Sequence, residues 1–112
     1  AARHFLTLPV QPSAIFCYND MLAIGVLRGL QEAGRNVPGD CSVAGFDNIT
    51  FSAFTNPPLT PFDQPKRSIG AEAARLVLGL LQETDEDRSA PKIIRLKGSL
   101  RVRESTAAPA RE

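Results

Sequence analysis

The sequence has few of the residues that build metal centres, disulfide frameworks and membrane spans. Its 112 residues include two cysteines, one histidine, one tyrosine and no tryptophan. Two cysteines and one histidine do not provide the paired ligand spacing of a structural zinc site. No apolar run approaches the roughly 20 residues that cross a bilayer. Because Cys17 and Cys41 lie in apolar, strand-like runs, we expect two buried free thiols in a reducing compartment rather than a disulfide.

The charge balance of the chain does not favour electrostatic binding to a polyanion. The formal net charge is +1, so this stretch by itself is not expected to bind nucleic acid or a membrane surface. Hydrophobic residues make up 43% and charged residues 22%, which is ordinary for a soluble domain. The first residues, Ala-Ala-Arg-His-Phe, are neither a signal peptide nor an initiating Met sequence, and we expect a fragment that begins within an element.

The stretch from Pro12 to Gly25 organises the rest of the chain. Residues 14–18 form a short apolar run with the length and composition of a buried strand, and Asn19 and Asp20 end it. A helical pattern follows over 20–33, with Asp20 expected as its N-cap. The two polar residues should therefore lie outside the carboxyl end of a strand, where open α/β sheets bind ligands.

The same arrangement recurs after the helix. Residues 41–46 form a second strand-like run, which ends at Asp47 and Asn48. Strand, helix and strand make a βαβ unit with parallel strands and a right-handed crossover. Both polar pairs should then meet at one edge of a parallel sheet, and the fold class predicted is α/β.

Further elements follow the βαβ unit. We expect a loop with one helical turn over 49–58 and an extended segment over 59–64, where Pro61 argues against a central strand. Pro65 should open a helix that stops around 82–84. The remaining segments are predicted as a charged linker at 85–91, strands at 92–96 and 99–103, and a disordered tail at 107–112.

Several strings, taken together, resemble one family. They are A-I-F-C-Y-N-D-M-L-A-I-G at 14–25, V-P-G-D-C-S-V-A-G-F-D-N at 37–48 and P-P-L-T-P-F-D-Q-P at 57–65, with I-G-A-E-A-A at 69–74 and L-R-V-R-E-S-T at 100–106. In this order and spacing they are similar to the C-terminal part of the effector-binding domain of LacI/GalR-family transcriptional regulators. The resemblance covers nearly the whole chain.

The resemblance implies a periplasmic-binding-protein-like (type I) domain of two α/β lobes with a cleft between them. Residues 1–58 would belong to the C-terminal lobe, 59–64 to an interlobe crossover and 65–98 to the N-terminal lobe. Residues 99–106 would return to the C-terminal lobe before the tail at 107–112. Most of the first lobe and the DNA-binding helix-turn-helix headpiece would be absent from this sequence.

The resemblance also assigns candidate ligand-binding residues. Asn19 and Asp47 would hydrogen-bond effector hydroxyls, although each also has a local interpretation, Asn19 as a turn residue and Asp47 as the cap of a following turn. Asn48 is a weaker neighbouring candidate. Gln64 matches a crossover glutamine of the family, or else caps the helix that Pro65 opens. Because Pro61 stands where a second Thr is common, the identity of the effector does not carry over.

Other residues have two interpretations each. Tyr18 would stack on a ligand ring or belong to the strand core, and Asp20 is an N-cap first and a ligand contact second. Three apolar helix residues are predicted as core or subunit interface: Met21, Leu22 and Ile24. Three arginines are predicted as a solvated strand face: Arg95, Arg101 and Arg103.

The function implied is that of an effector sensor in a cytoplasmic regulator. A sugar or small metabolite would close the lobes of a homodimer and change the operator affinity of the missing headpiece, with no cofactor, metal or membrane partner. The alternative is a secreted or periplasmic sugar-binding protein of a transport system. An enzyme is not expected, because no nucleophile–base pair, metal cluster or cofactor fingerprint can be assembled around Asn19 and Asp47.

Overall fold

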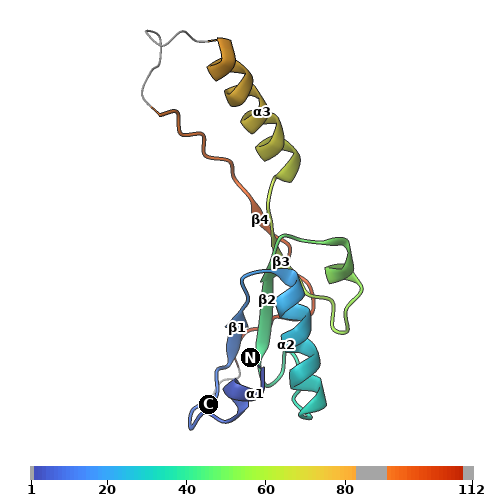
Figure 1. Cartoon of the computed structure of the whole chain (residues 1–112). Coiled ribbons are helices and arrows are strands. Elements are labelled where there is room, and N and C mark those ends of the chain that lie inside the picture. The colour runs from blue at the N-terminus through green and yellow to red at the C-terminus, as the bar shows by residue number, and fades with distance from the viewer. Residues whose placement is uncertain (1, 83–90, 110–112) are drawn as a thin grey trace. The chain divides into compact units, whose positions relative to one another are not determined.

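The structure, a computed structural model, describes residues 2–82 and 91–109. The chain divides into two compact units, the first formed by Ala1–Gln64 with Ser99–Glu112 and the second by Pro65–Gly98. The first unit holds a four-stranded sheet in the order β1-β2-β3-β4 (Figure 1). The first three strands are parallel and the fourth is antiparallel to its neighbour, which confirms the predicted α/β class.

The predicted βαβ unit is the centre of the first unit. β1 (Ala14–Phe16) pairs in parallel with β2 (Ser42–Phe46), and α2 (Asp20–Glu32) connects them. In Figure 1, α2 runs alongside the sheet, and α1 (Ala2–Leu6) lies near its far end. Both carboxyl ends of these parallel strands therefore meet at one edge, as the sequence predicted.

The hydrophobic core lies between α2 and the sheet. Alternation along β2 points Val43 and Gly45 towards the helix, while Phe46 is on the opposite face with Phe16 of β1. The buried apolar side chains are Ile15, Cys17, Ala23, Val26, Leu27, Leu30, Cys41, Val43 and Leu59. Cys17 and Cys41 are buried free thiols, as predicted.

β3 (Thr60–Asp63) corrects one expectation, because it lies inside the sheet between β2 and β4. Its Pro61 was expected to exclude a central position. The Pro61 carbonyl accepts a hydrogen bond from the Arg101 amide, so the ring nitrogen of Pro61 also faces the β4 side of the strand. β4 (Ser99–Leu100) pairs with Phe62 and Asp63 only, so Pro61 lies just past the end of this pairing. The missing N–H donor of proline thus falls at the end of a short ladder. Before β3, the predicted helical turn is η1 (Thr50–Ala53).

The segment after β4 runs back across the sheet and fills the gap where β2 and β3 separate. Ser105 is fully buried there. Its Oγ accepts from the Thr60 amide and donates to the Val43 carbonyl, and its own carbonyl accepts from the Val43 amide. The Ala107 amide donates to Ser42 Oγ at the start of the tail predicted at 107–112, and residues 110–112 lie outside the described residues.

The second unit consists of α3 (Lys66–Gln82) and the extended residues 91–98. Pro65 precedes α3, and its carbonyl accepts the first intrahelical bond, from Ile69. The strand predicted at 92–96 is not formed, because among the described residues no segment pairs with it. The linker predicted at 85–91 lies outside the described residues except for Pro91.

Candidate functional site

A pocket of about 290 Å³ opens at the carboxyl ends of β1 and β2. Its lining residues are Phe16, Tyr18, Phe46, Asp47 and Gln64. Tyr18 is 84% exposed and Phe16 67% exposed, so both rings are available to a ligand. Three of the predicted ligand residues thus come together here, namely Tyr18, Asp47 and Gln64. The alternative that Tyr18 belongs to the strand core is wrong.

Aromatic rings form one side of this pocket. Phe46 stacks on Phe62 of the neighbouring strand, with ring centroids 5.2 Å apart and an interplanar angle of 11°. Phe16 meets Phe46 edge-on, at 6.4 Å and 88°. Such pairs are favourable aromatic geometries and hold the rings in place. This wall was not predicted from the sequence, although the spacing of the phenylalanines at the ends of the predicted strands is the signal that could have indicated it.

A carboxylate and an amide provide the polar groups of the pocket. The Nε2 amide of Gln64 donates to Oδ1 of Asp47 over 2.6 Å. Together these two side chains offer donor and acceptor atoms of the kind that bind a hydroxyl group in both directions. Since Pro65, not Gln64, stands directly before α3, the expectation that Gln64 caps this helix is wrong.

The turn that carries Asp47 has an unusual backbone. Asp47 has φ 105° and Asn48 has φ 53°, both in the region that side-chain-bearing residues seldom enter. The Asp47 amide donates to the Phe62 carbonyl, and the Ile49 amide donates to Oδ2 of Asp20 over 2.8 Å. The turn is therefore held by bonds from other elements rather than by its own conformational preference.

Asn19, not Asp20, caps α2, which corrects the prediction by one residue. Asn19 Oδ1 accepts from the Leu22 amide at 2.9 Å. Asn19 does not line the pocket, so its contact with an effector stays a prediction. Asn48 likewise uses its Oδ1 within the protein, as the acceptor for Arg103.

Asp20 is a structural residue. Its side chain is completely buried, which leaves no surface of it for a ligand. Burial raises the pKa of the Asp20 carboxyl, and the nearby Asp47 charge raises it further, while the bonds from Ile49 and Ser52 and the charge of Arg103 lower it. A Cβ added at Gly45 would collide with Oδ1 of Asp20, so the side chain packs where only a glycine leaves room.

Arg103 is the residue that sequence reasoning placed wrongly. It was expected on a solvated face, yet it is half-buried and its guanidinium makes three hydrogen bonds. The acceptors are Ser52 Oγ, the Leu59 carbonyl and Asn48 Oδ1. Alternation gives no signal that separates it from Arg101, which is exposed and pairs with Asp63 at 3.0 Å.

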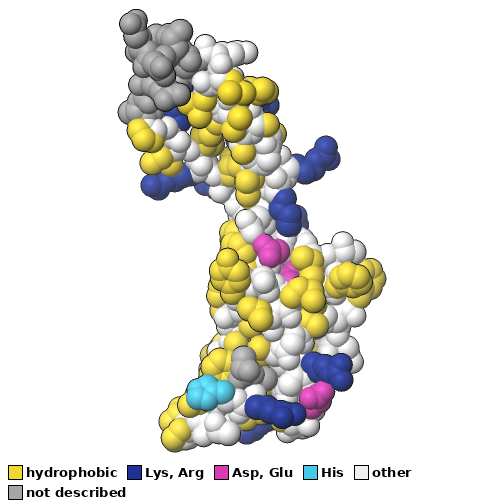
Figure 2. Space-filling model, viewed as in Figure 1, with side chains coloured by type: hydrophobic (Ala, Val, Ile, Leu, Met, Phe, Trp, Pro, Cys, Tyr) yellow, Lys and Arg dark blue, Asp and Glu magenta, His cyan; other side chains and the backbone are white. Residues whose placement is uncertain are grey.

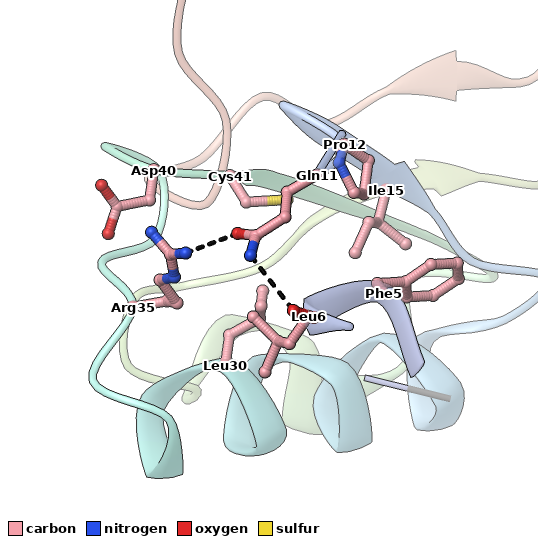
Figure 3. Close-up of a pocket in the computed structure, with 9 residues that line it drawn as sticks. All are labelled: Phe5, Leu6, Gln11, Pro12, Ile15, Leu30, Arg35, Asp40 and Cys41. Carbon is pink, nitrogen blue, oxygen red and sulfur yellow. Dashed lines mark hydrogen bonds between the residues drawn. The ribbon is translucent and has the colours of Figure 1, made fainter. Parts of the chain in front are cut away.

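A second cavity lies at the opposite, amino ends of β1 and β2 (Figure 3). Gln11 spans its mouth, donating to the Leu6 carbonyl and accepting from Arg35. Its volume of about 20 Å³ is room for one water molecule, not for a metabolite. No group of three or more potential metal ligands occurs in the part of the chain that the structure describes.

Comparison with protein families shows which family the chain belongs to. Residues 1–106 match the model of the periplasmic binding protein-like domain. The chain belongs to this family. No helix within the described residues is both long and apolar enough to cross a membrane.

The similar proteins confirm the resemblance to LacI-family regulators. The chain is 39% identical to the HTH-type transcriptional repressor PurR of Vibrio atlanticus over 88 residues, which cover 79% of the chain and 26% of that repressor. That relative is a transcriptional repressor. The chain spans about a quarter of the length of that repressor.

Several solved structures of LacI-family regulators are also similar to this chain. A putative LacI-family regulator from Sanguibacter keddieii superimposes with a TM-score of 0.86 at 33% identity, over 96% of this chain and 40% of that one. A LacI-family regulator from Enterococcus faecium with bound ribose gives 0.79 at 34% identity, over 98% and 39%. A dimeric Lac repressor with a C-terminal deletion gives 0.82 at 31% identity, over 97% and 39%. All three of these solved structures are of LacI-family regulators.

Proposed function

We propose that this chain is part of the effector-sensing domain of a bacterial transcriptional regulator, with a sugar or sugar-like metabolite as the effector. The observation that carries the proposal is the Asp47–Gln64 pair beside the aromatic wall at the carboxyl edge of the parallel sheet. A sugar ring presents an apolar C–H face and a polar rim of hydroxyls. The aromatic rings suit the first, and the carboxylate and amide suit the second.

The chain supplies one wall of the proposed binding site. Residues 1–58 would act as the C-terminal lobe and 65–98 as a segment of the N-terminal lobe, with 59–64 crossing and 99–106 returning. An effector that binds the closed arrangement of two lobes better than the open one shifts the population towards closure. Asn19 would add a contact from its side-chain amide once a ligand is present.

The regulator would act as a homodimer in the cytoplasm, with a helix-turn-helix headpiece on operator DNA. Four exposed apolar side chains of the first unit fit such an interface: Met21, Leu22, Phe51 and Phe54. Met21 and Leu22 belong to the first turn of α2, and Phe51 and Phe54 belong to η1 and the residue after it. The hydrogen bond from the Ile49 amide to Asp20 joins these two elements. Figure 2 shows that hydrophobic side chains reach the surface on several parts of the chain. Lobe movement in a dimer would change headpiece spacing and thereby operator affinity.

A sugar panel on the intact protein tests the proposal. Neutral pentoses, hexoses and disaccharides, with ribose first, are added one by one while the melting temperature is followed. A bound sugar stabilises the folded state by mass action, so one member of the panel should raise the melting temperature in proportion to the logarithm of its concentration. The same sugar should change affinity for operator DNA. A rise without any change in DNA affinity favours a transport protein.

A further inference from the structure

We infer that Arg103 is a positioning residue for the effector site, holding the turn Asp47–Ile49 in the conformation that aims Asp47 into the pocket. The inference rests on the proposed function, because it concerns the same site. Arg103 itself does not line the pocket. It acts through Asn48, whose Oδ1 accepts from its Nη2 over 2.8 Å.

The turn needs an external brace because its backbone is strained. Two successive residues with side chains, Asp47 and Asn48, adopt φ of 105° and 53°. Such conformations persist only where the surroundings over-determine them. Asp and Asn tolerate the left-handed region better than other residues with side chains, which reduces the strain without removing it.

Each residue of the turn has its own anchor on a different element. Asp47 is tied to β3 and the residue after it, through its amide to Phe62 and its carboxylate to Gln64. Ile49 is tied to α2 through Asp20. For Asn48 the described residues offer one side-chain anchor, Arg103 of the C-terminal segment. Loss of Arg103 would therefore free the middle of the turn and weaken the hydrogen bonds that hold its two ends.

The guanidinium is suited to this task by its shape. Nη1 donates to Ser52 Oγ at 3.0 Å and to the Leu59 carbonyl at 2.8 Å, and these two bonds fix the plane of the group. The second nitrogen, Nη2, is then directed at Asn48. A lysine would have one donor nitrogen for acceptors that lie in different directions, so the rigid fork of arginine is required.

The main competing explanation is that Arg103 only stabilises the fold. Ser105 offers a matched comparison, because it lies two residues further along the same segment and bridges β2 and β3 without touching the turn. Ser105→Ala removes buried hydrogen bonds and should lower stability. A positioning residue changes site geometry as well, and a merely structural residue does not.

The test uses the intact protein with Arg103→Met, which retains the apolar stem, Arg103→Lys and Ser105→Ala. The first readout needs no ligand: NMR hydrogen exchange of the Asp47 and Ile49 amides, which are both hydrogen-bonded in the structure. The second is the Kd of the panel sugar that raises the wild-type melting temperature most. We expect Arg103→Met to speed exchange and raise the Kd by about tenfold each, from the loss of charge-assisted bonds.

Arg103→Lys should restore only part of the affinity, and Ser105→Ala should lower the melting temperature while leaving the Kd within about twofold of wild type. A glycine at position 48 adopts positive φ freely, so Arg103→Met should cost little further affinity in an Asn48→Gly background. The inference is overturned if Arg103→Met changes neither exchange nor Kd beyond the changes seen in Ser105→Ala. If no sugar binds the wild type, the proposed function fails, and the exchange readout alone decides the role of Arg103.

Discussion

The side-chain amide of Gln64 donates a 2.6 Å hydrogen bond to the carboxylate of Asp47 and so joins the residues that follow β3 and β2. Gln64 is also the last residue of the first unit before the chain enters the second at Pro65. The pair therefore connects the proposed ligand carboxylate to the segment through which the chain leaves the sheet. A ligand that engages both side chains would sense the position of that segment.

Replacement of Gln64 by methionine should weaken sugar binding. Methionine has a similar length but no amide, so Asp47 loses the hydrogen bond from Gln64 and the ligand loses one polar contact. We expect the Kd to rise by about fivefold to tenfold, the range for one neutral hydrogen bond of about 1 kcal/mol, with little change in melting temperature. Isothermal titration with the panel sugar measures the effect. An unchanged Kd would remove Gln64 from the site.

Gly45→Ala should destabilise the protein, because an added Cβ would collide with Oδ1 of Asp20 and lie 3.0 Å from Leu59 Cδ2. Both neighbours are fully buried, so they cannot move aside. We expect a loss of about 1–3 kcal/mol in the free energy of unfolding, as for other overpacked cores.

Gly25→Ala is the matched control for this substitution. A Cβ at Gly25 would meet nothing within 4 Å, and the residue is exposed inside α2. Alanine should therefore stabilise the helix by up to about 1 kcal/mol. Urea denaturation of both variants measures the difference. Equal effects at the two positions would contradict the close packing of Asp20 on Gly45.

The buried carboxyl of Asp20 should make stability depend on pH. Its pKa is raised above 3.8 in the folded protein, chiefly by burial, so the folded state keeps this proton to a higher pH than the unfolded chain does. In the interval between the two pKa values the folded state binds more protons. The contribution of Asp20 to the free energy of unfolding therefore falls as the pH rises through that interval.

Asp20→Asn isolates this contribution, because asparagine retains an acceptor for the Ile49 amide and does not titrate. Denaturation of both proteins from about pH 4 to about pH 7 should show the wild type losing stability relative to the variant as the pH rises. A wild type that gains stability relative to the variant over this range would mean that the folded-state pKa is lowered instead.

The arrangement that positions the site was predictable from local patterns. Apolar runs that end in polar pairs, with an amphipathic segment between them, predicted the βαβ unit and the shared edge of its strands. The same patterns brought Asp47 and Tyr18 to one pocket. Local signals were sufficient here because strand length, helical periodicity and crossover handedness are decided by neighbouring residues.

The errors concern residues whose roles depend on distant partners. Asn19 and Asp20 are both residue types that favour the N-cap position. The Asp20 carboxylate instead accepts a hydrogen bond from the distant Ile49 amide, and Asn19 caps the helix. Pro61 fits a central strand because the neighbouring β4 is short. Arg103 is half-buried because its guanidinium is bound by acceptors from other parts of the fold. These acceptors lie 44 to 55 positions away in the sequence. No local pattern carries such information.

The most direct test of the account is a calorimetric titration of the panel sugar into the intact wild type and its Asp47→Asn variant. Asparagine tolerates the left-handed backbone of this position, and it removes the charge and replaces one acceptor oxygen with an amide donor. We expect the Kd to rise by about tenfold or more, while the melting temperature and the operator affinity without sugar stay close to those of the wild type. Unchanged sugar affinity, or a loss of affinity matched by a loss of folding stability, would contradict a ligand site at Asp47.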